Sequence, residues 1–437
     1  MLWLPPRRFP KNPNIQTQFV IVHDYNHPMH KSQSISTLRV LLPISIGTCL
    51  SLLGDTSLYT VLPTHITEAG ILLANVGILL SANRWVRLPL NGPAGFLIER
   101  WPRKPVFVLA LFLGVISTTL YAVTNGFWPL FVARLLWGIA WVGIWIGGNT
   151  IVMDISTHEN RGRRVGIYQM GFFIGAGGGA FLGGVLTDLF GYHTAMGVNA
   201  ALSLAGALLA LIFLPETRMW LGNTNPVPVE VQETNPVHTR QFYRTQLSEM
   251  ASATALLAVT RLAQAGFLMA TFGLLLQQNY GEAISFSGMT VGVATLTGLG
   301  LAMTTFVAMI TAPISGSLAD RTHNRWRVAV GGLVFGAVGY GLLTFRAPAA
   351  IIAGLIGTSI AAGTNTNLST SLMGGLGPPN QQGRRLGILF TVGDLASAVG
   401  PPLAYWLMAT TQLEGVYWTA TGVCVLMGGV TMRWSKR

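Results

Sequence analysis

Apolar stretches of about 20 residues recur along the whole chain and are separated by polar segments. A helix needs roughly 20 apolar residues to cross a bilayer, whereas a barrel strand needs about 10 residues of alternating polarity. The pattern therefore predicts an all-α integral membrane protein with twelve membrane-spanning helices, at 38–60, 70–97, 105–124, 127–152, 165–187, 194–214, 252–277, 285–316, 328–345, 349–373, 387–408 and 413–433.

The longest polar interruption between apolar stretches, residues 215–250, is rich in Pro, Asn and Glu, as linkers often are. It divides the chain into an N-terminal six-helix half at 37–214 and a C-terminal half at 251–437. Residues 1–36 lack the apolar core of a signal peptide, so we expect a cytoplasmic tail. Met29 opens a segment that offers an alternative start of translation, which would leave residues 1–28 untranslated.

A repeat at one fixed offset relates the two halves. Residues 162–167, Gly-Arg-Arg-Val-Gly-Ile, recur 221 positions later as Gly-Arg-Arg-Leu-Gly-Ile at 383–388. At the same offset, Glu99-Arg100 matches Asp320-Arg321 and Gly179 matches Gly400. Two homologous halves that run in the same direction are typical of secondary transporters, whose substrate sites lie near mid-membrane between the halves.

Composition excludes an ordinary soluble enzyme, because only 10% of the residues are charged and 51% are hydrophobic. The net charge of +12 would suggest a nucleic-acid partner in a soluble domain. Here, however, 21 Lys and Arg lie in segments on one side of the predicted membrane, and only Arg346 lies on the other. This bias predicts a multi-pass protein of the inner or plasma membrane with both termini in the cytoplasm, and no nucleic-acid partner.

The sequence contains no phosphate-binding loop and no HExxH motif, so we expect neither an enzyme nor a bound cofactor or metal. Its two cysteines, Cys49 and Cys424, both lie in apolar stretches, which argues against a disulfide framework.

The segment after the second apolar stretch reads Gly-Phe-Leu-Ile-Glu-Arg-Trp-Pro-Arg-Lys at 95–104. It resembles the signature of the major facilitator superfamily between helices 2 and 3, Gly-x-Leu-x-acid-Arg-x-Gly-Arg-Lys, with Pro102 at the second glycine. Arg-Leu-Leu-Trp-Gly at 134–138 resembles the helix 4 motif of that family. The resemblance implies the major facilitator fold, alternating access and a gating motif. That motif comprises Gly95, Glu99, Arg100, Arg103, Lys104 and Asp154, with a degenerate second copy at Asp320 and Arg321.

The gate is expected to be asymmetric, because Gly375 stands in the second half where Asp154 stands in the first. The alternative is that these charges only set the topology.

Four glycines repeat at steps of four in the fifth apolar stretch, Gly171, Gly175, Gly179 and Gly183. Such a face lets two helices approach closely, and we expect Gly400 to pack in the same way. The stripe also resembles the glycine-rich helix 5 motif associated with antiporters of the superfamily, with Ala176 at the usual proline.

Six ionisable residues fall inside apolar spans: Asp55, Asp394, Arg84, Arg87, Arg134 and Arg261. Each costs at least about 2.5 kcal/mol at mid-membrane unless it is paired or hydrated. Counting 1.5 Å per residue, Asp55 and Arg134 both lie about 10–12 Å below the outer boundary. They could form a permanent salt bridge, or compete for a proton and substrate.

We interpret Asp55 and Asp394 as proton-coupling candidates. Arg84 and Arg87 lie on one helix face and could bind an anionic group or answer acids on helix 1 or 11. The predicted substrate cavity is lined by Arg84, Arg87, Arg134, Trp137, Trp141, Arg261, Gln264, Asn365 and Asn367. For the tryptophans the alternative is packing. The polar run 364–370 indicates contacts with substrate or an unwound turn.

Two transport hypotheses compete. One is proton-coupled efflux of drug-like or amphipathic compounds, and the other is an organic-anion symporter or exchanger that uses the intramembrane arginines. A receptor without transport is a third possibility. We expect a monomer whose partners are membrane lipid, a small-molecule substrate and the proton.

Overall fold

The computed structural model describes residues 37–157, 160–218, 240–286, 289–376 and 382–436. Within these ranges the side chains of 95, 96, 99, 240–244, 286, 289, 382 and 383 are not described. The predicted tail at 1–36 and most of the predicted linker therefore lie outside the described residues.

Six helices make up the N-terminal half, as the hydropathy pattern predicts. They are α1 (Thr37–Val61), α2 (Leu73–Arg100), α3 (Arg103–Val123), α4 (Phe127–Asp154), α5 (Arg161–Phe190) and α6 (Tyr192–Phe213).

The C-terminal half begins with α7 (Arg240–Arg261), which starts inside the predicted linker. The π-helix η2 (Leu262–Leu268) and α8 (Met269–Tyr280) continue it without a break. A hairpin of β1 (Ala283–Phe286) and β2 (Met289–Gly292) follows. The remaining helices are α9 (Val293–Thr322), α10 (Arg325–Leu342), α11 (Pro348–Gly375) and α12 (Gln382–Ser435).

Twelve membrane-crossing segments result among the described residues. The run α7–η2–α8 makes one crossing, and α12 makes two because its backbone turns at Gln412, where φ is 64°. Nine of the described helices are long and apolar enough to cross a membrane by length and composition, with α12 counted once. The other two crossings are α2, which carries Arg84 and Arg87 in its middle, and α10, which carries Arg325 and Arg327 in its first turn.

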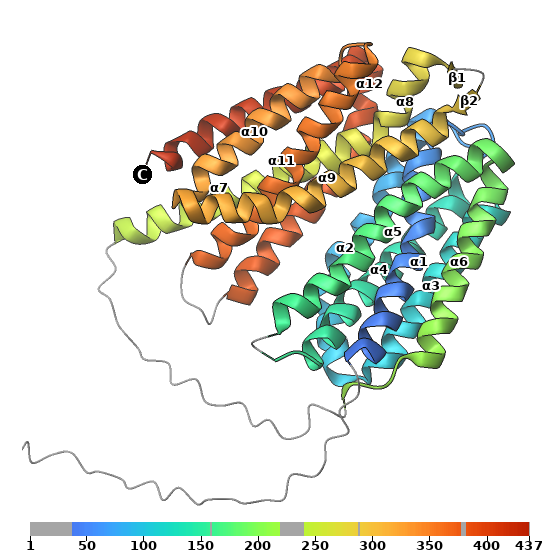
Figure 1. Cartoon of the computed structure of the whole chain (residues 1–437), viewed down its shortest axis with the longest axis horizontal. Coiled ribbons are helices and arrows are strands. Elements are labelled where there is room, and N and C mark those ends of the chain that lie inside the picture. The colour runs from blue at the N-terminus through green and yellow to red at the C-terminus, as the bar shows by residue number, and fades with distance from the viewer. Residues whose placement is uncertain (1–36, 158–159, 219–239, 287–288, 377–381, 437) are drawn as a thin grey trace, which may run out of the picture. The chain divides into compact units, whose positions relative to one another are not determined.

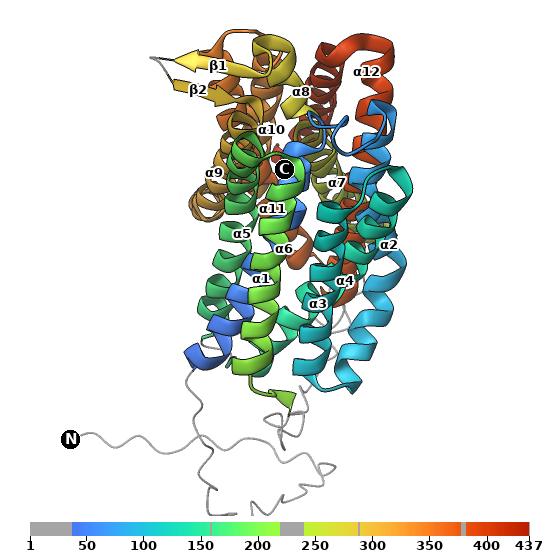
Figure 2. The same cartoon turned by 90° about the vertical axis from the view of Figure 1, so that its right-hand side faces the viewer.

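The predicted start of the helix at 285–316 is wrong. Its first residues belong to the hairpin, in which Ser285 pairs with Thr290. Figure 2 shows this hairpin at the end of the helical unit where α8 finishes. The apolar residues of the hairpin prolong the hydropathy signal of α9, so composition alone could not locate its start.

The glycine stripe of α5 packs against α1. A Cβ on Gly171 or Gly175 would lie 2.8 or 2.5 Å from the carbonyl oxygens of Ser45 and Cys49. Gly179 and Gly183 approach α1 just as closely. The repeat reproduces this contact in the second half, where Gly400 of α12 packs against Gly266 of η2. The predicted packing role of these glycines is therefore present in both halves.

The helical unit has two ends of opposite charge. We call the end with Arg100, Arg103, Lys104, Arg163 and Arg384 the basic end. The other, the acidic end, carries Glu68, Asp188, Glu282 and Glu414. Large apolar side chains cover the outer faces of helices between these ends, for example Ile212 and Phe213 of α6 and Phe335 of α10. Helices with such apolar outer faces are suited to contact with lipid.

The halves meet along two helix pairs, α5 with α9 and α2 with α12. In the first pair, Gly184 and Gly298 allow contact with the backbones of Ala294 and Ala180. In the second, Gly77 lies against Pro401 and Pro402. All of these residues lie toward the acidic end, and Figure 1 shows the two sets of helices diverging toward the basic end.

Candidate functional site

A buried ion pair between Asp55 of α1 and Arg134 of α4 lies in the N-terminal half. Nη1 of Arg134 donates to Oδ1 of Asp55. The arginine is fully buried, and the Asp55 side chain is 12% exposed. The two residues that the sequence places at one depth thus form a salt bridge, one of the two expected arrangements. Opposite charges attract strongly in a low-dielectric interior.

The same guanidinium ties a third helix into the site. Nε of Arg134 donates to the carbonyl of Leu79 at 3.0 Å, and Nη2 donates to the carbonyl of Leu80 at 3.2 Å. Both carbonyls belong to α2. Arg134 therefore joins α1, α2 and α4, and its donors do not depend on Asp55 alone.

Tyr59 is a member of this site that sequence reasoning missed. Its hydroxyl accepts from Nη2 of Arg134 at 3.0 Å and donates to the carbonyl of Leu80 at 2.6 Å. The guanidinium carbons of Arg84 and Arg134 each lie 5.1 Å from the centroid of the Tyr59 ring. A ring at this distance attracts a cation. The available signal was its spacing, since residues four apart share one helix face and Tyr59 follows Asp55 by four.

Arg84 extends from α2 into the other half. Its Nη1 donates to the carbonyl of Ser397 at 2.8 Å and to that of Ala265 at 3.2 Å. Ala265 lies in η2, where the backbone leaves the ordinary α-helical pattern. Such π-helical turns are frequent at functional sites. No sequence signal predicted η2, whereas α11 is continuous through the polar run 364–370, where an unwound turn was one expectation.

Arg87, one turn further along α2, forms an ion pair with Asp394 of α12, with 3.3 Å between Nη2 and Oδ1. Asn91 donates to the other carboxylate oxygen at 3.5 Å. Of the two expectations for these arginines, an answer to an acid on helix 11 is the one seen for Arg87. Two arginines of α2 thus reach across the boundary between the halves.

The remaining polar cavity candidates of the C-terminal half are Arg261 and Gln264. Arg261 is exposed and passes beside Gly393, and within the described residues no hydrogen bond or ion pair holds its side chain. It lies near the Arg87–Asp394 pair, where Asp394 attracts it and Arg84 and Arg87 repel it. Gln264 of η2 accepts from the hydroxyl of Tyr340 at 3.2 Å.

Three predicted cavity residues pack inside one half instead. Trp137 is 1% exposed and lies against Gly114 of α3. Asn365 is buried against Gly332 of α10. Asn367 donates to the carbonyl of Ala312 at 2.8 Å and so joins α11 to α9. In this structure these three contact neighbouring helices of their own half, as a polar or aromatic residue in an apolar span can do, and their place in a substrate cavity stays a prediction.

Trp141 belongs to an aromatic stack that is partly exposed. Its ring lies 5.6 Å from that of Trp145 and 5.8 Å from that of Phe172 on α5, measured between centroids. Trp145 in turn lies 5.3 Å from Phe172. These three rings form an apolar aromatic cluster between α4 and α5, in which the two tryptophans are stacked and Phe172 lies edge-on to Trp145.

At the basic end, Arg103 forms a buried ion pair with Asp154, with 3.1 Å between Nε and Oδ2. Glu216 completes this cluster, which the sequence did not predict. Its carboxylate accepts from the backbone N–H groups of Arg103 at 2.9 Å and Lys104 at 3.1 Å. A carboxylate at a helix N-terminus satisfies free donors and the helix dipole. The segment after α6 is thus fastened to the start of α3.

The other residues of the predicted gating motif have surroundings that differ from those of the buried cluster at Arg103. The carbonyl of Arg100 accepts from Arg218. Asp320 and Arg321 are exposed. For Gly95 and Glu99 only the backbone is described. In the second half, Arg325 donates to the carbonyl of Ser371 at 3.3 Å, and a Cβ on Gly375 would lie 3.3 Å from its Nη1. A helix-terminal carbonyl replaces the acid there, so the two copies differ.

Comparison with known proteins identifies the family. The family model described as the Major Facilitator Superfamily matches residues 44–303 and 254–437. The chain belongs to this superfamily. It is therefore a membrane transporter of a small molecule rather than an enzyme.

Among the relatives of this superfamily member, the class G tetracycline resistance protein of Vibrio anguillarum is 27% identical over 359 residues. The match covers 80% of this chain and 86% of that protein. Multidrug resistance protein 1 of Bacillus subtilis is 28% identical over 184 residues, or 41% of this chain and 45% of that protein. The crystal structure of a bacterial homolog to human lysosomal transporter Spinster, in an inward-facing and occupied conformation, covers 91% of this chain and 96% of its own. Its TM-score is 0.73 at 15% identity, which shows the shared fold.

Proposed function

We propose that this transporter exports drug-like or amphipathic compounds in exchange for protons. The observation that carries the proposal is the buried pair of Asp55 and Arg134, because it places one protonatable carboxylate against a fixed cation between three helices. The named functions of the relatives in Vibrio anguillarum and Bacillus subtilis, tetracycline and multidrug resistance, support export as the direction.

In this proposal the basic end faces the cytoplasm, following the bias of Lys and Arg. The structure then corresponds to an inward-facing state, since the halves are joined toward the acidic end. A compound entering from the cytoplasm meets the partly exposed rings of Trp141, Trp145 and Phe172, which suit flat apolar molecules.

A proton arriving on Asp55 removes the charge that holds α1 to α4. Arg134 keeps its bonds to the carbonyls of Leu79 and Leu80. Protonation therefore weakens one contact of the site without leaving the guanidinium unsatisfied. That is a suitable arrangement for a coupling residue, because the two protonation states favour different helix positions.

The anion-transport alternative has less support from the geometry. Arg134 is neutralised by Asp55 and Arg87 by Asp394, while Arg84 is held by two carbonyls. Of the four intramembrane arginines, only Arg261 is exposed and lacks a described hydrogen bond or ion pair, and Asp394 attracts it as well.

The test uses inside-out vesicles that carry a pH gradient. Addition of a transported drug such as tetracycline should dissipate the gradient, and Asp55→Asn should lower the rate of this dissipation at least tenfold. Glu414→Gln, which changes an exposed acid outside the predicted gating motif and outside the Asp55 site, serves as the matched control and should retain it. Drug-dependent proton movement in Asp55→Asn protein that elutes as a folded monodisperse species would refute the coupling role.

A further inference from the structure

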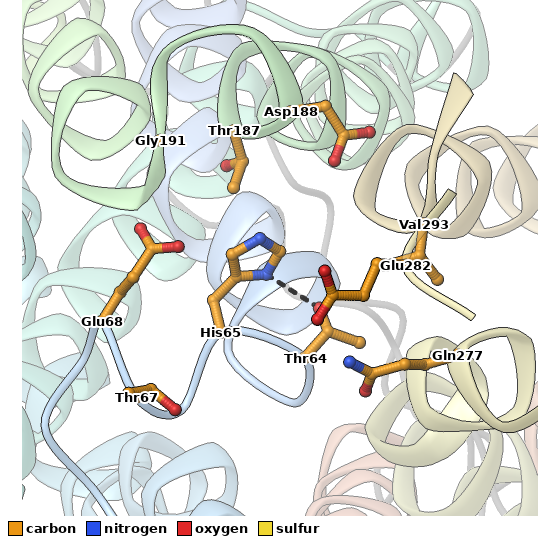
Figure 3. Close-up of a pocket in the computed structure, with 10 residues that line it drawn as sticks. All are labelled: Thr64, His65, Thr67, Glu68, Thr187, Asp188, Gly191, Gln277, Glu282 and Val293. Carbon is orange, nitrogen blue, oxygen red and sulfur yellow. Dashed lines mark hydrogen bonds between the residues drawn. The ribbon is translucent and has the colours of Figure 1, made fainter. Parts of the chain in front are cut away.

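A separate polar cavity lies at the acidic end and is lined by both halves. Its volume is about 440 Å³, within the range of sites for small organic molecules. The loop after α1 and the end of α5 line it from the N-terminal half, and α8 and the start of α9 line it from the other. Figure 3 shows these side chains converging around His65.

Three carboxylates line this cavity, Glu68, Asp188 and Glu282, and none of the lining residues is Lys or Arg. Two of them accept hydrogen bonds from backbone N–H groups in the first turn of a helix. Glu68 accepts from the N–H of Tyr192 at 3.0 Å, and Asp188 accepts from the N–H of Thr295 at 2.7 Å. Each of these bonds uses one carboxylate oxygen. Within the described residues, no hydrogen bond reaches the carboxylate of Glu282.

Thr187 gives an independent indication of a ligand. It is only 3% exposed, and its hydroxyl has no hydrogen-bond partner among the described residues. Figure 3 shows its side chain extending from α5 toward the space beside His65. Many other helical threonines of this chain bond the carbonyl four residues earlier, as Thr60 does at 3.1 Å. A buried hydroxyl is rarely left unpaired in a native protein. The Thr187 hydroxyl is therefore suited to accept a hydrogen bond from a ligand.

We propose that this cavity binds a small organic amine that carries two or more ammonium groups. Ammonium groups are hydrogen-bond donors only, and the cavity offers carboxylates, the Thr187 hydroxyl and the amide oxygen of Gln277 as acceptors. Among the described residues, no three Asp, Glu, His or Cys side chains are close enough to hold one metal ion. The negative charge is thus spread over the cavity, which suits a ligand whose positive charges are also spread.

A bound amine of this kind bridges the two halves, because Glu68 and Asp188 belong to one half and Glu282 to the other. The site goes beyond the proposed export function, since its residues are distinct from Asp55 and Arg134. Its occupancy is measurable without any transport assay.

The test measures binding of radiolabelled spermidine to the full-length protein in nanodiscs of neutral phosphatidylcholine at low ionic strength, where surface charge is least screened. Spermidine should bind saturably. Glu282→Gln removes a charge without removing a described hydrogen bond and should weaken binding about tenfold, the effect of one charge-assisted bond. Thr187→Val keeps the side-chain size and should weaken binding about threefold.

The matched control is Glu414→Gln, which removes an exposed acid at the same end that does not line the cavity. It should leave the affinity unchanged. Absence of saturable spermidine binding would overturn the proposal. Equal weakening by Glu414→Gln would also overturn it, by showing that only surface charge is sensed. Displacement of spermidine by an equimolar amount of Mg²⁺ would do so as well, by showing a site for inorganic cations.

Discussion

Arg87 of α2 and Asp394 of α12 form an ion pair between the two halves, and its atoms Nη2 and Oδ1 are 3.3 Å apart. The arginine side chain is 13% exposed and the aspartate 32%. Together with the bonds of Arg84 to Ser397 and Ala265, it links the halves near the mid-point of α2. The relative position of the halves therefore depends on charges inside the membrane-spanning segments.

Neutralising this pair should shift the protein away from the state described here. We expect Asp394→Asn to lower the ratio of the inward-facing to the outward-facing conformer about fivefold, because a partly exposed ion pair contributes about 1 kcal/mol. The measurement is the distance distribution between spin labels at Arg163 and Arg384, two exposed residues at the basic ends of different halves. The exchanged pair Arg87→Asp with Asp394→Arg should restore the original distribution. An unchanged distribution in Asp394→Asn would show that backbone packing alone sets the conformer.

The pair of Asp55 and Arg134 should show strong thermodynamic coupling. Asp55→Asn leaves Arg134 fully buried without its counter-charge, so we expect a loss of about 3 kcal/mol in stability. Removing both charges with Asp55→Asn and Arg134→Gln should cost less than the sum of the single changes. Thermal unfolding in detergent, followed with a thiol-reactive dye that reports exposure of Cys424, gives this comparison. Strict additivity would contradict the pairing.

The glycine stripe offers a test with an adjacent control. Gly179→Ala would put a Cβ 2.7 Å from the backbone Cα of Leu53, so we expect a loss of about 1–3 kcal/mol through displacement of α1. The neighbouring Gly178 has no atom within 4 Å of such a Cβ. Gly178→Ala should therefore be neutral or slightly stabilising, since alanine favours helix. Folded yield and thermal midpoint of the two variants provide the comparison, and equal loss would contradict the packing argument.

The asymmetry of the basic end can be reversed. Gly375→Asp places an acid beside Arg325, whose flexible end lies 3.3 Å from the new Cβ position and has room to adjust. This pair would copy that of Arg103 with Asp154, and we expect a gain of up to about 1 kcal/mol in thermal stability. Gly375→Asn is the uncharged control and should give less. No difference between the two variants would show that Arg325 does not reach the acid.

The Glu216 contact predicts a separate effect. Glu216→Gln removes the negative charge at the start of α3 and should lower the stability by about 0.5–1 kcal/mol. Asp154→Asn should cost about 3 kcal/mol, because it leaves the buried Arg103 unpaired. The order of the two thermal midpoints is the observable, and a larger effect of Glu216→Gln would contradict it.

The sequence by itself determined the twelve apolar segments, the repeat and the division of charge between the two ends. These features are local or periodic, since each segment must satisfy its own backbone in lipid. It also located Asp55 and Arg134 at one depth, because depth follows from counting residues along a helix.

Only the tertiary structure decided which helix each side chain faces. Arg84 and Arg87 reach the C-terminal half, whereas Trp137, Asn365 and Asn367 turn into their own halves. The cavity of Glu68, Asp188 and Glu282 is assembled from three segments that are distant in the sequence. Such placements depend on helix rotation, on the π-helical turn of η2 and on the contact between the halves. Hydropathy along one chain carries no information about these three, since they arise from contacts between residues distant in sequence.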